Sequence, residues 1–174
     1  MREFLQALVL LLLIPAAAAQ QAQEHEVKAA FLFKFPAFVE WPDGTAPGRP
    51  FVIAVAGAPD VAAELARIAE GRQIHGRAVR VRALGEGESA AGVQVLFVGR
   101  DSPRLRELAR ALAGAPTLIV SEAPAGLEQG AMINFVPSEG RVRFDVAPAA
   151  AERSGLRLSS RLLAVVQSVR GPRL

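Results

Sequence analysis

Apolar residues along the chain follow two periods, and the two periods alternate. Continuous or alternating apolar runs, typical of strands, cover 51–56, 79–82, 93–98 and 117–120. Apolar positions three or four residues apart, typical of helices, cover 24–35, 61–68 and 105–112. Strands and helices in alternation predict a sheet of parallel strands connected by crossover helices.

Local signals set the expected ends of these helices. Pro36 should end the first helix because its ring clashes with the preceding turn. Asp60 and Ser102 are candidate N-caps of the next two helices, since their side-chain oxygens can accept hydrogen bonds from first-turn amides. Gly71 and Gly114 are expected to close those helices. Both helices should therefore begin directly after the turn that ends a strand.

The C-terminal third follows a different pattern. Two apolar runs, 131–136 and 141–146, flank a Pro-Ser-Glu-Gly tetrapeptide, which is a hairpin signal. A last helix is expected from Ser159 or Ser160 to Arg170, before a Gly-Pro pair. The chain should thus end in a β-hairpin followed by a helix.

The N-terminus carries a separate pattern, typical of a secretory signal. Arg2 precedes a nearly unbroken aliphatic run at 5–14, and an A-x-A cleavage site ends at Ala19. The run is shorter than the roughly 20 residues that a membrane-spanning helix needs. We therefore expect a signal peptide over residues 1–19, cleavage near Gln20, a periplasmic location and no stable membrane insertion after cleavage. The alternative is an uncleaved membrane anchor.

Composition narrows the class of protein. The 174 residues include no Cys and carry a formal net charge of +3. The basic residues are nearly all Arg and are scattered among acids, which favours a solvated surface over a nucleic-acid-binding stripe. The lack of Cys excludes disulfides and thiol nucleophiles. No repeat or linker divides residues 20–174, so we expect a single α/β domain with a mixed, mostly parallel sheet flanked by helices.

Candidate catalytic residues are few. His25 and His75 are the only histidines, and neither has a partner at the spacing of a metal site. The chain contains no G-x-S-x-G, H-E-x-x-H or P-loop motif. Ser159 and Ser160 are more readily explained as helix caps than as nucleophiles. The sequence therefore predicts neither an enzyme nor a metal or cofactor site.

Two strand-to-helix turns are candidates for ligand binding. In an open α/β sheet such turns line the crevice at the strand ends, and helix N-termini there can accept an anionic group. The alternative is that both are ordinary turns and caps. The candidate crevice residues are Gly57, Asp60, Arg100 and Ser102.

An aromatic stripe marks the first helix and its exit. Phe31, Phe35, Phe38 and Trp41 lie near one face at helical spacing. Such a stripe is more often core than a partner-binding surface, so we expect burial.

Several segments together resemble the YfiR-like family of periplasmic proteins. They are EVKAAFLFKF at 26–35, FVEWP at 38–42, VLFV at 95–98, GAMINF at 130–135, RVRFDV at 141–146 and SGLRLSSRLL at 154–163. The resemblance spans nearly all of the chain after the signal. It implies an α/β regulator that tends to form homodimers.

The resemblance also implies a function. The family's namesake represses a membrane diguanylate cyclase by binding its periplasmic sensor domain, and other relatives could serve histidine kinases. The namesake uses disulfides, whereas this chain has no Cys, so redox control is not expected. The family places functional interest near the strand at 141–146, where Arg143 and Asp145 share a face expected to be wet. Candidate partner-binding residues are Arg143, Asp145, Ser154 and Arg157. The alternative function is binding of a small ligand or a cell-wall fragment.

Overall fold

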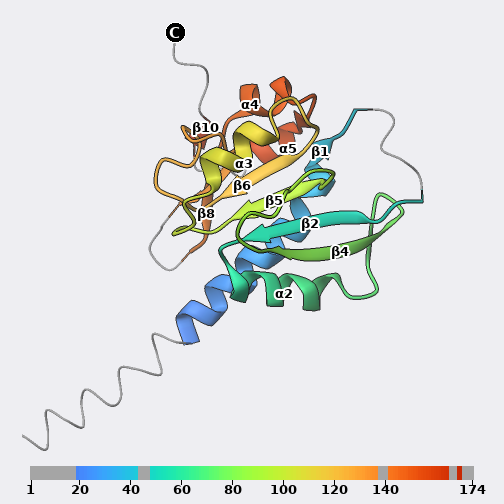
Figure 1. The fold of residues 1–174 in the computed structure, drawn as a ribbon, viewed down its shortest axis with the longest axis vertical. Helices are drawn as coiled ribbons and strands as arrows, with labels where there is room; N and C mark the ends of the chain where they lie inside the picture. Colours follow the sequence, from blue (N-terminus) through green and yellow to red (C-terminus); the bar gives the residue numbers. More distant parts are fainter. Residues whose placement is uncertain (1–18, 43–47, 137–140, 165–167, 170–174) are drawn as a thin grey trace, which may run out of the picture.

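Eight strands form one sheet in the structure, a computed structural model that describes residues 19–42, 48–136, 141–164 and 168–169. The strands are β2 (Phe51–Ala56), β3 (Gln73–Ile74), β4 (Arg77–Leu84), β5 (Val95–Val98), β6 (Leu118–Ser121), β7 (Ile133–Val136), β8 (Arg143–Val146) and β10 (Ser168–Val169). Their order across the sheet is β10-β8-β7-β6-β5-β2-β4-β3 (Figure 1). A separate two-stranded sheet pairs β1 (Val39–Glu40) with β9 (Arg157–Leu158).

The strand directions confirm the predicted mixed, mostly parallel α/β sheet. β4, β2, β5, β6 and β7 are parallel to one another, whereas β3 pairs antiparallel with β4, and β7 and β8 form the predicted antiparallel hairpin. The first of the parallel strands, β2, lies between β4 and β5, so the chain winds outward in both directions from it. The boundary between β2 and β5 is therefore the point at which the strand order reverses, where open α/β sheets commonly bind ligands.

Helices cover both faces of the sheet. Residues 19–34 form an N-terminal helix that continues into the 3-10 turn η1 (Phe35–Phe38), and the later helices are α2 (Pro59–Ala69), α3 (Leu105–Ala111), α4 (Pro148–Arg153) and α5 (Ser160–Leu163). The N-terminal helix and α2 pack side by side, joined by an ion pair between Glu26 and Arg67 at 3.4 Å. Right-handed crossovers that leave β2 and β5 in opposite directions place α2 and α3 on opposite faces.

Aromatic rings form the core beneath the N-terminal helix, as its apolar stripe predicted. Phe35 is only 1% exposed and lies 5.1 Å from Phe144 and 5.9 Å from Phe135, measured between ring centroids. Phe31 stacks on Phe35 at 5.8 Å but is half-buried. Trp41 is also half-buried. The stripe is thus core at its centre and partly exposed at its two ends.

Two helix starts differ from the sequence prediction. Asp60 is not the N-cap of α2, because the helix already begins at Pro59 and Ala58 is its N-cap. Ser102 is not the N-cap of α3, whose N-cap is Arg104. Residues 99–104 make turns first, and Ser102 Oγ accepts a 3.5 Å hydrogen bond from the Arg104 amide within them. Pro59 suits the first position of α2 because its missing N–H would have no partner there. The turn in which Ser102 accepts the Arg104 amide makes α3 begin later than predicted.

The C-terminal end also departs from the prediction. Ser159 caps α5 as expected, since its Oγ accepts a 3.4 Å hydrogen bond from the Leu162 amide. The predicted continuation to Arg170 is wrong, because α5 ends at Leu163 and β10 pairs in parallel with β8. The sequence after α5 is rich in Val, which favours a strand wherever an unpaired sheet edge is available. The short helix α4 was not predicted. The hairpin turn 137–140 and most of the expected signal peptide lie outside the described residues.

Candidate functional site

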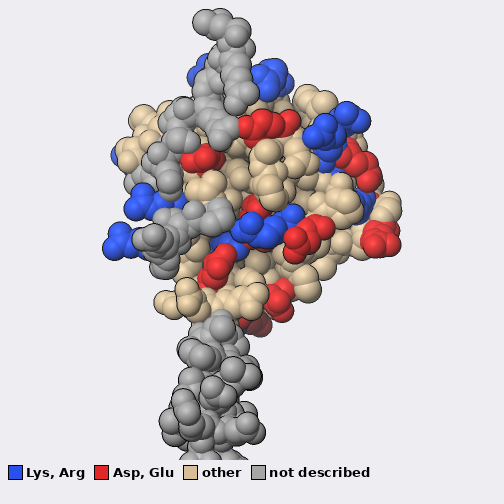
Figure 2. Space-filling model, turned by 90° about the vertical axis from the view of Figure 1, so that its left-hand side faces the viewer, with Lys and Arg blue, Asp and Glu red and all other residues tan. Residues whose placement is uncertain are grey.

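A cleft lies at the carboxyl ends of the parallel strands, under the first turns of the N-terminal helix. β2 leads into Gly57, β5 into Arg100 and β6 into Glu122, and all three residues line the cleft. Figure 2 shows this side of the molecule, on which acidic and basic side chains are interspersed. Because parallel strands end at one edge, residues far apart in sequence meet here.

The two strand-to-helix turns touch one another through their backbones. A Cβ on Gly99 would lie 2.3 Å from the carbonyl oxygen of Gly57, and a Cβ on Gly57 would lie 2.7 Å from the Cβ of Ser102. Gly57 also has a φ of +67°, a conformation that side chains rarely adopt. Glycine at both positions therefore allows the turns to close the crevice directly above the β2–β5 boundary.

Three of the four predicted ligand residues line the cleft, and one does not. Gly57, Asp60 and Arg100 all line the cleft, as the sequence predicted for neighbouring turns. Ser102 is not a lining residue, because it packs against Gly57. The open space lies on the other side of the turns, toward the N-terminal helix.

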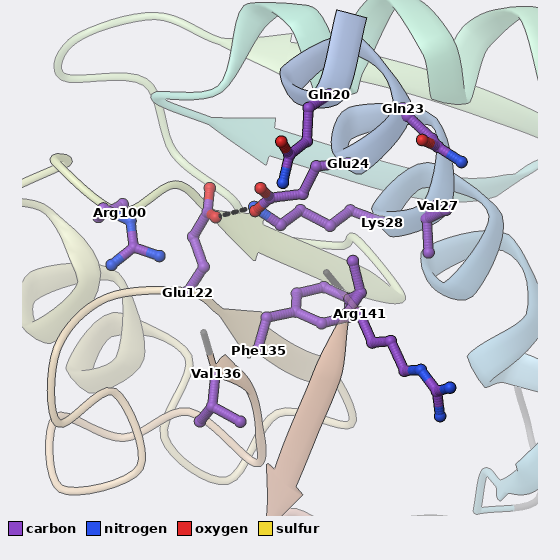
Figure 3. Close-up of a pocket in the computed structure, with 11 residues that line it drawn as sticks. Gln20, Gln23, Glu24, Val27, Lys28, Arg100, Glu122, Phe135, Val136 and Arg141 are labelled. Atoms are coloured by element: carbon purple, nitrogen blue, oxygen red, sulfur yellow. Dashed lines mark hydrogen bonds and ion pairs between the residues drawn. The ribbon is translucent and has the colours of Figure 1, made fainter. Parts of the chain in front are cut away.

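A charged cluster that the sequence analysis missed divides this space. Lys28, on the inner face of the N-terminal helix, is only 5% exposed, and its Nζ donates a hydrogen bond to Glu122 directly after β6. The same Nζ lies 2.5 Å from Oε1 of Glu24, one helical turn earlier (Figure 3). Glu122 is itself buried. Buried charges persist only when paired, so the cluster fixes the helix against the carboxyl edge of the sheet.

The cluster also sets the charge state of Glu24. The hydrogen bond from Lys28 lowers the pKa of Glu24, and the nearby charges of Lys28, His25 and Arg100 act in the same direction, while partial burial opposes them. Glu24 therefore remains ionised at neutral pH. With Lys28 counted as one positive charge, the two carboxylates leave the cluster with one formal negative charge in excess.

Two adjoining cavities make up the cleft, and they share Glu24, Lys28, Arg100 and Glu122. The larger cavity, of about 440 Å³, has an apolar wall formed by Val27, Phe135, Val136 and Val142. The smaller cavity, of about 360 Å³, is lined by the first turn of α2 and is mostly polar. Cavities of this size accommodate small organic molecules.

Arg100 is placed differently from Lys28. Its side chain lines both cavities and is exposed, and no hydrogen bond or ion pair joins it to another of the described residues. In Figure 3 its guanidinium lies on the Glu122 side of the cleft. The cleft thus has one cation engaged by two carboxylates and two exposed arginines, Arg100 and Arg141, that form no hydrogen bond or ion pair with another of the described residues. In Figure 3 the guanidinium of Arg141 points away from Arg100 and the charged cluster, so Arg100 is the better placed of the two for a ligand in the cleft.

The predicted partner-binding residues lie elsewhere. Arg143 on β8 and Arg157 on β9 are exposed, whereas Ser154 is buried at the C-cap of α4. Asp145 shares the more exposed face of β8 with Arg143 but is itself half-buried. β10 covers the outer edge of β8 beside Asp145. In the described part of the chain, no hydrogen bond or ion pair connects any two of these four residues.

Asp145 faces a second buried polar group. It is paired across the hairpin with Asn134 of β7, which is 7% exposed. Oδ1 of each side chain is buried without a hydrogen-bond partner in the described residues, although Nδ2 of Asn134 donates to the carbonyl of Ala123 at 3.2 Å. Oδ1 of Asp145 is therefore not accessible to another protein, although the residue as a whole is half-buried.

The histidines take separate positions. His25 lies 3.9 Å from Asp60 at the smaller cavity, and Nε2 of His75 lies 3.1 Å from the carbonyl oxygen of Pro36. Across residues 19–42, 48–136, 141–164 and 168–169, no group of three or more His, Asp or Glu side chains could hold a metal ion.

None of the described helices is long and apolar enough to cross a membrane.

These features define an open, doubly wound α/β domain with a cleft at the carboxyl edge of its sheet. A similar fold occurs in the crystal structure of a conserved domain protein from Vibrio cholerae O1 biovar El Tor, with a TM-score of 0.54 and 15% sequence identity. The match covers 84% of this chain and 60% of that one, so this chain spans about three fifths of its length. No curated protein matches the chain in sequence.

The family model described as YfiR/HmsC-like matches residues 25–167. The chain therefore belongs to the YfiR/HmsC-like family, as its sequence segments indicated.

Proposed function

We propose that this protein is an exported regulator that binds the periplasmic sensor domain of an inner-membrane signalling protein. A diguanylate cyclase is the preferred partner class, a histidine kinase is the other, and repression is the expected direction of control. The observation that carries the proposal is the YfiR/HmsC-like match over residues 25–167. The signal-like pattern at residues 1–19 supports a periplasmic location.

Regulation of this kind needs no chemistry in the regulator. A binding protein shifts a partner between two states only by binding one state more tightly. A tenfold preference corresponds to about 1.4 kcal/mol, which is enough to change the output of the partner visibly. A homodimer, as the family resemblance implies, would present two such binding surfaces.

The contact surface that we propose runs from β8 through α4 to β9. Arg143 and Arg157 are its best candidates for direct contact, because both are exposed and the other described residues leave them without an ion pair. Ser154 is buried at the end of α4, so it would act by holding that helix in position. Asp145 would act by supporting the hairpin with Asn134.

Deleting the gene and complementing it tests this proposal. Cyclic-di-GMP and sensor-kinase output would be measured in the deletion strain carrying wild-type protein, Arg143→Glu or the matched control Arg106→Glu on α3. We expect wild type and Arg106→Glu to restore the output and Arg143→Glu to restore it only in part. If deletion changes neither output, and the purified protein binds no envelope signalling domain, the regulatory proposal is wrong.

A second candidate function is the binding of a small ligand or a cell-wall fragment. The two-cavity cleft favours it, because the cleft lies at the edge of the sheet where α/β proteins bind ligands and contains an available guanidinium. Binding would be detected on the isolated protein, without a partner.

A further inference from the structure

The cleft places Arg100, which forms no hydrogen bond or ion pair with another described residue, beside an apolar wall. We propose that it binds a small amphipathic carboxylate, with the carboxylate at Arg100 and the apolar body in the larger cavity. This inference rests on the second candidate function, ligand binding, and names the class of ligand. It does not depend on the regulatory proposal.

The carboxylates of the cleft do not compete strongly for Arg100. Glu24 and Glu122 both bind Lys28. The side chain of Asp60 is 76% exposed and lies 3.9 Å from Nδ1 of His25, and Asp101, which lines the smaller cavity, is also exposed. The negative groups are therefore either paired within the protein or turned toward solvent, and the guanidinium can accept an external anion.

A second donor group lies beside Arg100. The first turn of α2 lines the smaller cavity, and its N-cap, Ala58, provides no side-chain hydrogen bond. The amides of Asp60 and Val61 thus lack the usual cap, and the positive end of the dipole of this 11-residue helix points toward the cavity. A carboxylate at the boundary of the two cavities would meet both the guanidinium and this helix end.

The larger cavity selects the rest of the ligand. Its apolar wall consists of Val27 from the helix, Phe135 and Val136 from β7, and Val142 just before β8. Within a volume of about 440 Å³ this wall has room for a body the size of an aromatic ring or a short aliphatic chain. A ligand that lacks an apolar body would leave this wall in contact with water.

The charges around the larger cavity favour a ligand with a single negative charge. Lys28, Arg100 and Arg141 line this cavity together with Glu24 and Glu122, which leaves one formal positive charge in excess. A dianion would bring more negative charge than this excess balances, and its second charge would lie near Glu24 or Glu122. The arrangement therefore favours a monocarboxylate over phosphate esters and dicarboxylates.

Calorimetric titration of the purified protein with 4-phenylbutyrate tests this inference. The comparison ligands are 4-phenylbutanol, which lacks the charge, acetate, which lacks the apolar body, and 4-phenylbutylamine, which reverses the charge. We expect 4-phenylbutyrate to bind at least about tenfold more tightly than each of them, as the loss of a charge-assisted hydrogen bond or of the buried ring implies. The matched variants are Arg100→Gln and Arg106→Gln, both at exposed arginines.

Arg100→Gln should weaken 4-phenylbutyrate about tenfold or more, while Arg106→Gln should leave its affinity unchanged. Equal affinity for the alcohol, or tighter binding of the amine, would overturn the carboxylate assignment while leaving ligand binding itself in place. Equal effects of the two arginine variants would overturn the placement at Arg100. If none of the four compounds binds at millimolar concentration, the inference is wrong, whatever the outcome for the signalling partner.

Discussion

The two halves of the N-terminal helix meet the same sheet in opposite ways. The later half, together with the first residue of η1, buries Leu32 and Phe35, both at most 1% exposed, and Phe35 packs among the aromatic rings of β7 and β8. The earlier half presents Glu24 and Lys28 to the cleft and is otherwise largely exposed. One half anchors the helix through apolar burial, and the other forms the wall of a polar site. Substitutions in the earlier half can therefore alter the cleft without disturbing the anchor, which is the buried part of the helix at Leu32 and Phe35.

A substitution in the anchor should have the largest effect on stability. Phe35→Ala removes a ring that is 1% exposed and surrounded by other rings, so it should lower the free energy of unfolding by about 3–5 kcal/mol. Phe31→Ala is the matched variant. Because Phe31 is half-buried, its loss should cost clearly less, although the sequence alone predicts a full core position for it. Urea denaturation of both variants measures the difference, and equal losses would show that the helix is not anchored mainly at Phe35.

The charged cluster predicts a comparable or slightly smaller effect. Lys28→Met leaves Glu122 buried without its cation, which should lower the free energy of unfolding by about 3 kcal/mol. The double variant Lys28→Met/Glu122→Leu removes both charges and should recover much of that loss. Denaturation of both single variants and the double variant completes the cycle. If the effects simply add, Lys28 and Glu122 do not stabilise each other and the cluster is not a unit.

Glu24 predicts the smallest effect, and one that depends on pH. Its folded-state pKa lies below the ordinary value of about 4.5, so the ionised side chain stabilises the fold above that pH. This contribution is lost as pH falls through the folded-state pKa. The side chain is 47% exposed, so Glu24→Gln should cost less than about 1 kcal/mol at neutral pH. The difference between wild type and variant, followed by urea denaturation from pH 7 to pH 3, should shrink below about pH 4.5; a constant difference would contradict the ion pair.

The same comparison explains what could be predicted from the sequence. The anchor could be predicted, because Phe31 and Phe35 recur at helical spacing and the strands beneath them are apolar runs. The edge of the cleft could be predicted in part, because turns after neighbouring parallel strands must meet, and Gly57, Asp60 and Arg100 do so.

The charged cluster could not be predicted in full. Lys28 and Glu122 are 94 residues apart, and only the folded sheet brings them together. One signal was present, since Glu24 and Lys28 are four residues apart and Lys28 lies on the same face as the apolar stripe.

The strand β10 could not be predicted for a similar reason. A short Val-rich segment becomes a strand only when the edge of β8 is there to pair with it.

The most direct test of the central claim, that this family member is exported and acts in the periplasm, is the N-terminal sequence of the protein from fractionated cells. The account predicts that the protein is recovered from the periplasmic fraction with a terminus at or near Gln20. Cleavage there would place the new terminus at the polar half of the helix, beside the cleft that Gln20 lines. An intact Met1 terminus on protein recovered from the cytosol would contradict the account.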